Sequence, residues 1–356
     1  MSRTERRTAH ADLATSLALL SDTELWELVD SGSPLGTGIG GRTARVEVDG
    51  RPVFVKRVPL TGLELRPENV RSTANLFAVP PYLHYGIGNL GSPGLGAWRE
   101  LAVHTMTTNW VLADHFPGFP LMHHWRVLPD TSQPLPAELA DVERAVAYWG
   151  GGSGVRERIE GRRTASASLA LFLEYVPHTL HDWFDAQLRT GDADAACVWV
   201  EQRLGELTGF LGSSELLHFD AHFQNILTDG RRFCLTDYGL SLSTRFRLTP
   251  QERAFFERHR HYDRDYATRH LVIWLVTALY GHRGPERDAF IRAWADGVRP
   301  EGGIPRAAAD IITRYARPTA VMDDFVRRLS EESRLTAYPD KALNAAAQAV
   351  GMPASR

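Results

Sequence analysis

The sequence predicts an α+β protein with two lobes, the first containing β-structure and the second mainly helical. Two strand-like segments joined by the hairpin signal Asp49-Gly50 lie in the first half of the chain. Apolar residues at helical spacing fill most of the second half. A length of 356 residues is comfortable for two lobes, and 43% apolar residues are enough for a sizeable core.

A helical extension is expected before the first lobe. Within residues 1–30, apolar side chains recur at roughly helical spacing, which predicts one or two short helices. The glycine-rich run at residues 36–41 then interrupts the periodic pattern of apolar residues and is expected to be irregular. After it, strands are expected at residues 43–48 and 52–58, a helix at 97–113, and strands at 120–128 and 169–176.

Residues 129–167, between the last two of these strands, are expected to form an insertion or a mobile loop. They combine a short helix at residues 137–148, a Gly150-Gly151-Gly152 hinge and a basic polar stretch. With this insertion included, the first lobe is expected to cover residues 31–176.

The second lobe, residues 177–356, is expected to be mainly helical. A short β-rich piece at residues 225–240 interrupts it, with Asp229-Gly230 as a hairpin turn. The helices are expected at residues 179–188, 195–211, 263–280, 287–295, 307–315 and 320–329. A cleft between two such lobes is a common place for a ligand.

Composition excludes several classes of partner. A net charge of −3 gives no reason to expect nucleic acid or an anionic membrane surface. The longest apolar segment, residues 271–280, is shorter than the ~18 residues that a membrane span needs. Two cysteines, Cys197 and Cys234, are too few for a disulfide scaffold and favour a reducing, cytoplasmic setting.

Lysine is rare in this chain. Of the 40 basic residues only Lys56 and Lys341 are lysines, so 38 are arginines. Lysine is a compact point charge and arginine a wide planar fork, so a lysine kept against this bias indicates a site where arginine would not serve. Lys341 lies in a polar stretch near the end of the chain. Lys56 ends a predicted strand and is the better candidate, although an ordinary exposed strand lysine is the alternative.

Three glycines form the pattern G-x-G-x-x-G at Gly36, Gly38 and Gly41. Glycine lets backbone amides approach phosphate oxygens without an intervening side chain. A plain turn between two elements is the alternative interpretation. A dinucleotide-binding site is disfavoured, because a hairpin and not a helix follows the last glycine.

The strongest pattern lies in residues 218–225, which read His-Phe-Asp-Ala-His-Phe-Gln-Asn. Asp220 and Asn225 have the spacing H-x-D-x-x-x-x-N, and Asp237 follows twelve residues later in Asp-Tyr-Gly. Phosphoryl transfer needs a carboxylate facing the acceptor hydroxyl and oxygen ligands for Mg²⁺. Asp220 is the candidate for the first role, and Asn225 and Asp237 for the second. His218 is expected to brace this loop.

With these motifs in this order, the chain resembles the protein-kinase-like superfamily. Within it, the loop chemistry is similar to that of aminoglycoside phosphotransferases and related small-molecule kinases. The resemblance spans about residues 31–280 and implies a two-lobed protein-kinase-like fold that uses ATP with Mg²⁺. It implies an ion pair of Lys56 and Glu100 on the phosphates, although a solvated helix carboxylate is the alternative for Glu100. It also implies a hinge at Glu174 to Val176 that receives the adenine.

The acceptor is expected to be a hydroxyl of a small molecule. His222, two residues after Asp220, resembles the loops of small-molecule kinases, and the A-P-E element of protein kinases is absent. Asp263 and Asp265 could line the acceptor pocket with His222, or cap the helix that they begin. A protein or peptide kinase is the alternative function, and a nucleotide-binding pseudokinase-type module is a further one.

Overall fold

The computed structural model describes residues 2–190, 192–300 and 303–349, and it divides into two compact units. The first unit contains the residues up to 177 together with residues 234–252. The second contains residues 178–233 and those from 253 onward. The sequence placed residues 234–252 with the second lobe, but their contacts group them with the first. Both units mix helices and strands, and the protein is an α+β protein.

The first unit is built around one sheet and carries most of the β-structure. Its elements are α1 (Arg3–Leu19), α2 (Asp22–Asp30), β1 (Ser33–Gly38), β2 (Gly41–Val48), β3 (Arg51–Leu60), the short 3-10 helices η1 (Pro67–Asn69) and η2 (Pro81–His84), α3 (Ala97–Leu112), β4 (Met122–Pro129), α4 (Ala137–Ala140), α5 (Val142–Tyr148), α6 (Ser153–Arg163), β5 (Ala167–Glu174) and β10 (Leu242–Ser243).

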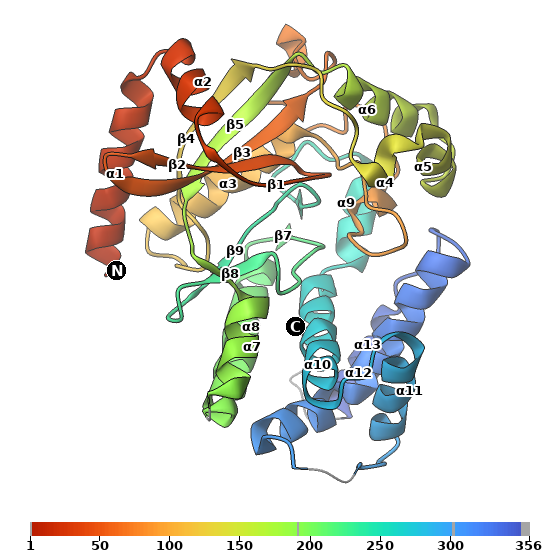
Figure 1. Ribbon diagram of the computed structural model, residues 1–356. Helices are drawn as coiled ribbons and strands as arrows, with labels where there is room; N and C mark the ends of the chain where they lie inside the picture. Colours follow the sequence, from red (N-terminus) through yellow and green to blue (C-terminus); the bar gives the residue numbers. More distant parts are fainter. Residues whose placement is uncertain (1, 191, 301–302, 350–356) are drawn as a thin grey trace. The chain divides into compact units, whose positions relative to one another are not determined.

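Five antiparallel strands form the sheet in the order β1-β2-β3-β5-β4 (Figure 1). Asp49 and Gly50 both have positive φ in the turn between β2 and β3, as the hairpin signal predicted. Successive residues of a strand point to opposite faces. Lys56 and Arg57 of β3 therefore lie on opposite faces of the sheet, and Arg42 of β2 pairs with Arg57.

The two faces of this sheet are covered by different helices. One core cluster joins apolar residues of α1 and α2 to Val53 and Val55 of β3. The other joins Trp98 and Leu101 of α3 to Val58 of β3 and to strand β5. Lys56 belongs by alternation to the face that α3 covers. The predicted N-terminal helices are thus confirmed, and they form a packed layer of the first unit.

The glycine-rich run is more regular than the sequence predicted. Gly36 and Gly38 lie within β1, and Gly41 begins β2, so the run is a hairpin with its turn at Ile39 and Gly40. The expectation of an irregular break is wrong because the backbone of β1 pairs with β2 even though β1 has few apolar side chains. All six residues of β1 are exposed.

Residues 129–167 form packed helices and not a simple mobile loop. The basic stretch after the three glycines is helix α6, and the predicted helix at residues 137–148 is two helices, α4 and α5. Their apolar residues enclose a third core with residues of the segment before α3. The members of this core that are buried are Phe77, Val79, Leu83, Leu90, Leu95, Leu139, Ala145, Val146, Trp149, Val155 and Ile159.

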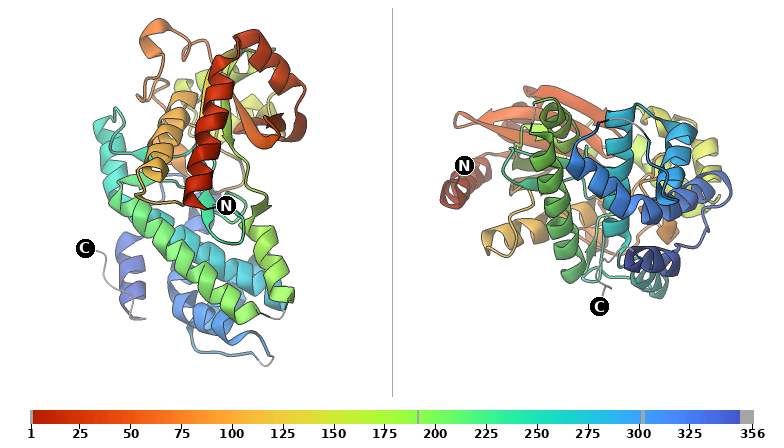
Figure 2. Two further views of the ribbon diagram at one scale, coloured as in Figure 1. Left: turned by 90° about the vertical axis from the view of Figure 1, so that its left-hand side faces the viewer. Right: turned by 90° about the horizontal axis from the view of Figure 1, so that it is seen from below.

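The second unit is mainly helical (Figure 2). Strand β9 (Phe233–Leu235) and helix α9 (Pro250–Arg258) carry the chain between the units. The other elements are β6 (His178–Thr179), α7 (Leu180–Arg189), α8 (Ala193–Ser213), β7 (Leu216–Leu217), β8 (Ile226–Thr228), α10 (Tyr262–Tyr280), α11 (Gly284–Ala295), α12 (Arg306–Glu331) and α13 (Asp340–Gln348). Residues 307–315 and 320–329, predicted as two helices, are the single helix α12, which contains the buried Pro318.

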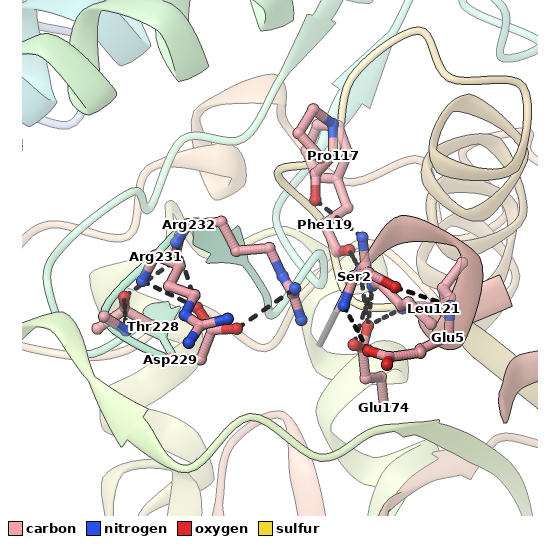
Figure 3. Close-up of polar contacts among 12 residues, drawn as sticks. Ser2, Glu5, Pro117, Phe119, Leu121, Glu174, Thr228, Asp229, Arg231 and Arg232 are labelled. Carbon is pink, nitrogen blue, oxygen red and sulfur yellow. Dashed lines mark hydrogen bonds and ion pairs between the residues drawn. The ribbon is translucent and has the colours of Figure 1, made fainter.

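Strand β6 pairs antiparallel with β8, and Thr179 caps α7 by accepting a hydrogen bond from the amide of Asp182. The predicted turn at Asp229-Gly230 is confirmed, with Gly230 at φ 79°. The Asp229 carboxylate accepts hydrogen bonds from the amides of Arg231 and Arg232 (Figure 3). Throughout the described residues, the helices are too short or too polar to traverse a lipid bilayer.

Candidate functional site

Three of the predicted site residues meet within the first unit. Lys56 Nζ donates hydrogen bonds to Glu100 Oε1 at 2.6 Å and to Asp237 Oδ1 at 2.8 Å. The Lys56 and Glu100 side chains are 8% and 3% exposed, whereas Asp237 is 44% exposed. Burial disfavours the charged amine, but the carboxylates of Asp237 and Glu100 outweigh it and raise the pKa of Lys56. The expected partnership of Lys56 with Glu100 is confirmed.

Helix α3, which carries Glu100, is fixed by buried charges at its start. Glu64 is fully buried, and its Oε1 accepts a hydrogen bond from the amide of Ala97 at 2.7 Å. It thereby caps a helix whose own N-cap residue, Gly96, has no side chain to do so. Arg99, next to Glu100, donates to Glu252 at 2.6 Å, with both side chains buried. Glu100 therefore faces Lys56 from a helix anchored on two sides.

Asp237 reaches Lys56 from a strained backbone. Its φ is 63°, in the left-handed region that residues with a side chain rarely adopt. Such strain persists where the surrounding structure requires it, and it is concentrated at functional sites. Tyr238, the next residue, is fully buried, and its ring meets that of His104 edge-on at 4.6 Å. This buried contact holds the Asp237 segment against α3.

The turn of the β1–β2 hairpin lies directly beside Lys56. A Cβ built on Gly40 would be 3.0 Å from Lys56 Nζ and 3.6 Å from Asp237 Oδ2. At Gly41, φ is 131° and a Cβ would lie 2.2 Å from the carbonyl oxygen of Arg57. A Cβ at Gly36 would make only an ordinary contact with Thr43 at 3.8 Å, and one at Gly38 would have nothing within 4 Å. The structure thus requires glycine at Gly41, and a side chain at Gly40, which the pattern G-x-G-x-x-G missed, would crowd Lys56.

Glu174 ends β5, and its carboxylate is engaged by the N-terminal helix (Figure 3). Arg6 of α1 donates to Glu174 through Nε at 2.9 Å and through Nη2 at 2.6 Å. The amide of Leu121 donates to the same carboxylate at 3.1 Å, and the Glu174 amide donates to the Leu121 carbonyl oxygen at 2.8 Å. Val176 follows two residues later and is buried. No sequence pattern predicted this role for Arg6.

A second group of predicted residues gathers in the second unit, in the loop between β7 and β8. His218 Nδ1 accepts a hydrogen bond from the amide of Asp220 at 3.2 Å, so His218 braces the loop as expected. Asn225 Nδ2 donates to the backbone oxygen of Asp220 at 3.0 Å and to its Oδ2 at 3.1 Å. The side-chain oxygen of Asn225, Oδ1, is then the atom suited to ligate a cation. Phe219, next to Asp220, has φ 68°.

Helix α10 supports this loop along one face. Asp263 accepts hydrogen bonds from the amides of His218 at 2.6 Å and Phe219 at 2.8 Å. Burial raises the pKa of Asp263 to about 6, and these two hydrogen bonds offset only part of that effect. One turn later, Tyr266 lies near Asp220, and burial together with the Asp220 carboxylate raises the pKa of the Tyr266 hydroxyl. Asp263 and Tyr266 are three positions apart and so share a face of the helix.

The predicted acceptor-pocket residues have different surroundings. His222 Nε2 lies 3.7 Å from Asp220 Oδ2, and a quarter of its side chain is exposed. Asp263 is occupied by the loop amides, and Asp265 accepts hydrogen bonds from Arg264 Nε at 3.0 Å and the Tyr338 hydroxyl at 2.6 Å. Both aspartates are buried and bonded within the second unit. Their contacts make them structural supports, which differs from the expectation that they line an acceptor pocket.

Comparisons with known proteins do not identify the chain. No protein-family model matches it, and no curated protein matches it either. The described residues contain no cluster of three or more histidine, cysteine, aspartate or glutamate side chains placed to hold a metal ion.

Proposed function

We propose that the chain is an ATP- and Mg²⁺-dependent phosphotransferase with a protein-kinase-like fold, which phosphorylates a hydroxyl group of a small molecule. The observation that carries the proposal is the double hydrogen bond of Lys56 to Glu100 and Asp237. In phosphoryl transfer, a lysine held by a glutamate contacts the phosphates, and an aspartate beside it carries the Mg²⁺. The same three residue types meet here from three separate segments of the chain.

Lys56 is suited to bind phosphate because its charge is maintained and its position is fixed. The two carboxylates keep it cationic, and the anchored helix α3 keeps Glu100 in place. The adjacent turn at Gly40 presents backbone without a side chain, which suits a close approach to phosphate oxygens. In the proposed site, Lys56 would exchange part of its contact with Asp237 for the α- and β-phosphates.

Mg²⁺ fits the donor groups that Asp237 and Asn225 provide. Mg²⁺ prefers carboxylate and amide oxygens, keeps several waters and commonly takes only one or two protein ligands beside the substrate phosphates. Asp237 is the more exposed carboxylate of the Lys56 group, and the amide nitrogen of Asn225 is committed to Asp220. Bound Mg²⁺ would neutralise charge on the β- and γ-phosphates. The proposal requires both side chains to reach the same nucleotide.

Asp220 is the proposed group facing the acceptor. The acceptor oxygen forms a bond to the γ-phosphorus, while the bond from that phosphorus to the bridging oxygen breaks and its electrons leave with ADP. Asp220 orients the hydroxyl and receives its proton, which then passes to solvent. Asn225 and His222 hold the Asp220 carboxylate in one orientation, and positioning of this kind supplies much of the rate in phosphoryl transfer.

A small-molecule acceptor is favoured over a protein by the residues around Asp220. His222 stands two positions after it, with its ring directed at the Asp220 carboxylate, and residues 244–260 contain no A-P-E element. The adenine is proposed to bind at Glu174 to Val176. The Glu174 carboxylate is already engaged by Arg6, so adenine recognition would fall to the backbone of this segment.

The proposal is tested by incubating the protein with Mg²⁺ and γ-labelled ATP. Separate reactions contain aminoglycosides, nucleosides, sugars, amino alcohols or a mixed protein extract. The expected result is label on a small molecule, lost in Asp220→Asn and retained in Asp185→Asn, whose carboxylate pairs with Arg189 on the exposed side of α7. Label on protein alone would refute the small-molecule acceptor and support the protein-kinase alternative. Transfer to no acceptor would contradict the proposed activity.

A further inference from the structure

A cavity of about 270 Å³ lies in the first unit, beside the β1–β2 hairpin. Its walls come from β1, β2 and β3, from the segment that follows β4, and from the end of α6 with the residues after it. Its charged lining residues are Arg42, Arg57, Arg162 and Asp130. Three guanidinium groups and one carboxylate give these four residues a combined charge of +2.

Arg42 and Arg57 enter this cavity from the face of the sheet opposite Lys56. Arg57 directly follows Lys56 in β3, so their side chains point to opposite faces. Arg42 is the cross-strand partner of Arg57 and shares its face. The sheet therefore separates these two arginines from the group formed by Lys56, Glu100 and Asp237, whereas Arg162 lies close enough to Glu100 for the two charges to interact.

Two of the arginines share one carboxylate. Arg42 Nη2 lies 2.6 Å from Asp130 Oδ1, and Arg57 Nη2 lies 2.8 Å from the same oxygen. Arg57 Nε also donates to the hydroxyl of Ser168 at 3.3 Å. Asp130 pairs with both cations and the charge of Asp30 also acts on Arg57, while Arg162 adds a further cation to the cavity lining.

Arg162 adds a third cation that no carboxylate balances in the cavity. It is 6% exposed, and it donates to the backbone oxygens of Pro93 and Ile39. Its Nε is buried and has no hydrogen-bond partner within the described part of the chain. The charged groups around it are Arg158, Glu64 and Glu100, and both glutamates are already paired, with Arg158 and Lys56 respectively. Burial lowers the pKa of Arg162 to about 9.

A buried excess of positive charge is unfavourable unless an anion compensates it. Arginine is also the side chain best suited to bind carboxylate or phosphate through paired N–H donors. The remaining walls are largely apolar, and the apolar lining residues are Pro59, Pro134, Leu135, Pro136, Ala165 and Ala167. A volume near the lower end of the ~300–1,000 Å³ typical of ligand pockets limits the occupant to a small molecule.

We propose that this cavity binds a small organic anion, with its carboxylate or phosphate on Arg42, Arg57 and Arg162 and its apolar body against the proline, leucine and alanine walls. The proposed anion site goes beyond the proposed phosphotransferase activity, because its three arginines have no role in that activity; Gly38 and Gly41 of the hairpin are the lining residues common to both.

The proposal is tested by calorimetric titration of the full chain without nucleotide. The probes are phenyl phosphate and benzoate, with benzyl alcohol as the neutral analogue, all at one ionic strength. We expect saturable binding of at least one anion, no binding of benzyl alcohol, and a loss of affinity of at least tenfold in Arg42→Gln. Whether phenyl phosphate or benzoate binds more tightly identifies the preferred head group.

Arg42→Gln is chosen as the test variant because Arg42 is one-third exposed and its loss leaves the Arg57–Asp130 pair intact. Its melting temperature is measured to verify folding. Arg163→Gln is the matched control, because Arg163 is the exposed neighbour of Arg162 on α6, and its affinity should equal that of the wild type. The proposal is overturned if neither anion binds, or if Arg42→Gln binds as the wild type does. It is also overturned if Lys56→Met, and not Arg42→Gln, abolishes binding.

Discussion

Lys56 Nζ lies 2.6 Å from Glu100 Oε1, although 44 residues separate them in the sequence. The same nitrogen lies 2.8 Å from an oxygen of Asp237, 181 residues away from it. Folding therefore gathers one buried cation and two carboxylates from a strand, a helix and a strained segment that follows β9. A group held this closely is sensitive to the shape of the cation as well as to its charge.

Replacement of Lys56 by arginine is expected to lower kcat/KM at least ~100-fold, the size of effect seen when one preorganised electrostatic contact is lost. A planar guanidinium needs more room than an ammonium, and the backbone at Gly40 leaves little space beside Nζ. The matched control is Lys341→Arg at the exposed start of α13. Equal steady-state activity of Lys56→Arg and the wild type would contradict this role for Lys56.

Asp220→Asn is expected to reduce turnover by a factor of hundreds and to leave ATP binding intact. The substitution keeps the shape of the side chain but removes the group that orients the acceptor hydroxyl and takes its proton. Single-turnover kinetics would report the loss, and calorimetry would report the nucleotide affinity. Near-normal turnover would show that another residue faces the acceptor.

Gly41→Ala is expected to destabilise the first unit by about 1–3 kcal/mol. The residue has φ 131°, and an added methyl group would meet the carbonyl oxygen of Arg57 at 2.2 Å. Gly38→Ala, where nothing lies within 4 Å of the added atom, is the control and should change stability far less. Thermal unfolding of the two variants checks the prediction, and similar melting temperatures would contradict it.

Arg6→Met is expected to destabilise the protein by about 3–5 kcal/mol, because it leaves the buried Glu174 carboxylate without its cation. Arg7 lies next to Arg6 but is about half exposed and makes a loose ion pair with Asp114 at 3.4 Å. Arg7→Met should therefore have little effect. Denaturant unfolding compares the two, and equal losses of stability would rule out a special role for the buried pair.

Asp263 should make stability depend on pH between about 4 and 6. Its pKa is raised from an ordinary value of 3.8 to about 6, so the folded protein holds a proton there that the unfolded chain has released. This contribution is present in full below pH 3.8 and is lost as the pH rises through 6. A shift of this size corresponds to roughly 3 kcal/mol.

The comparison that isolates this effect is wild type against Asp263→Asn, whose side chain does not titrate. Their difference in unfolding free energy, wild type minus variant, should fall as the pH rises from 4 to 6.5. Other titrating groups are common to both proteins and cancel from the difference. A difference that stays constant over this range would refute the raised pKa.

The rarity of lysine allowed Lys56 to be predicted as a site residue from the sequence. Arginine replaces lysine almost everywhere in this chain, so a position that keeps lysine indicates a site with a special requirement. In the structure, Lys56 pairs with the predicted partner Glu100. The hairpin turn at Asp49-Gly50 was equally clear, because only a few residue types favour positive φ. Both predictions rest on the type of residue at a single position or turn, which can be recognised without knowing the fold.

Helix α6 was not predicted from the sequence because its buried face is only partly apolar. The buried residues of this helix are Val155, Arg158, Ile159 and Arg162, which have ordinary helical spacing. Two of the four are arginines: Arg158 pairs with Glu64, and Arg162 donates to backbone oxygens. Only two of the four buried positions are apolar, so a hydrophobicity pattern predicts a polar loop for this segment.

Long-range contacts account for the residues that the sequence did not reveal. Gly40 lies in an ordinary turn by sequence, and only its approach to Lys56 shows that a side chain there would crowd the Lys56 amine. Asp263 and Tyr266 share a helical face, but their common target, the loop at residues 218–220, is more than 40 residues away. Arg6 is one of many arginines, and its burial against Glu174 depends on how α1 packs.

The most direct test of the proposed nucleotide site is a calorimetric titration of ATP into the wild type, with Mg²⁺ and with a chelator in its place. We expect saturable binding that depends on Mg²⁺ and weakens at least ~10-fold in Asp237→Asn, since one ligand and its orienting contacts are lost. ATP that fails to bind under either condition, or binds Asp237→Asn and the wild type equally, would contradict it.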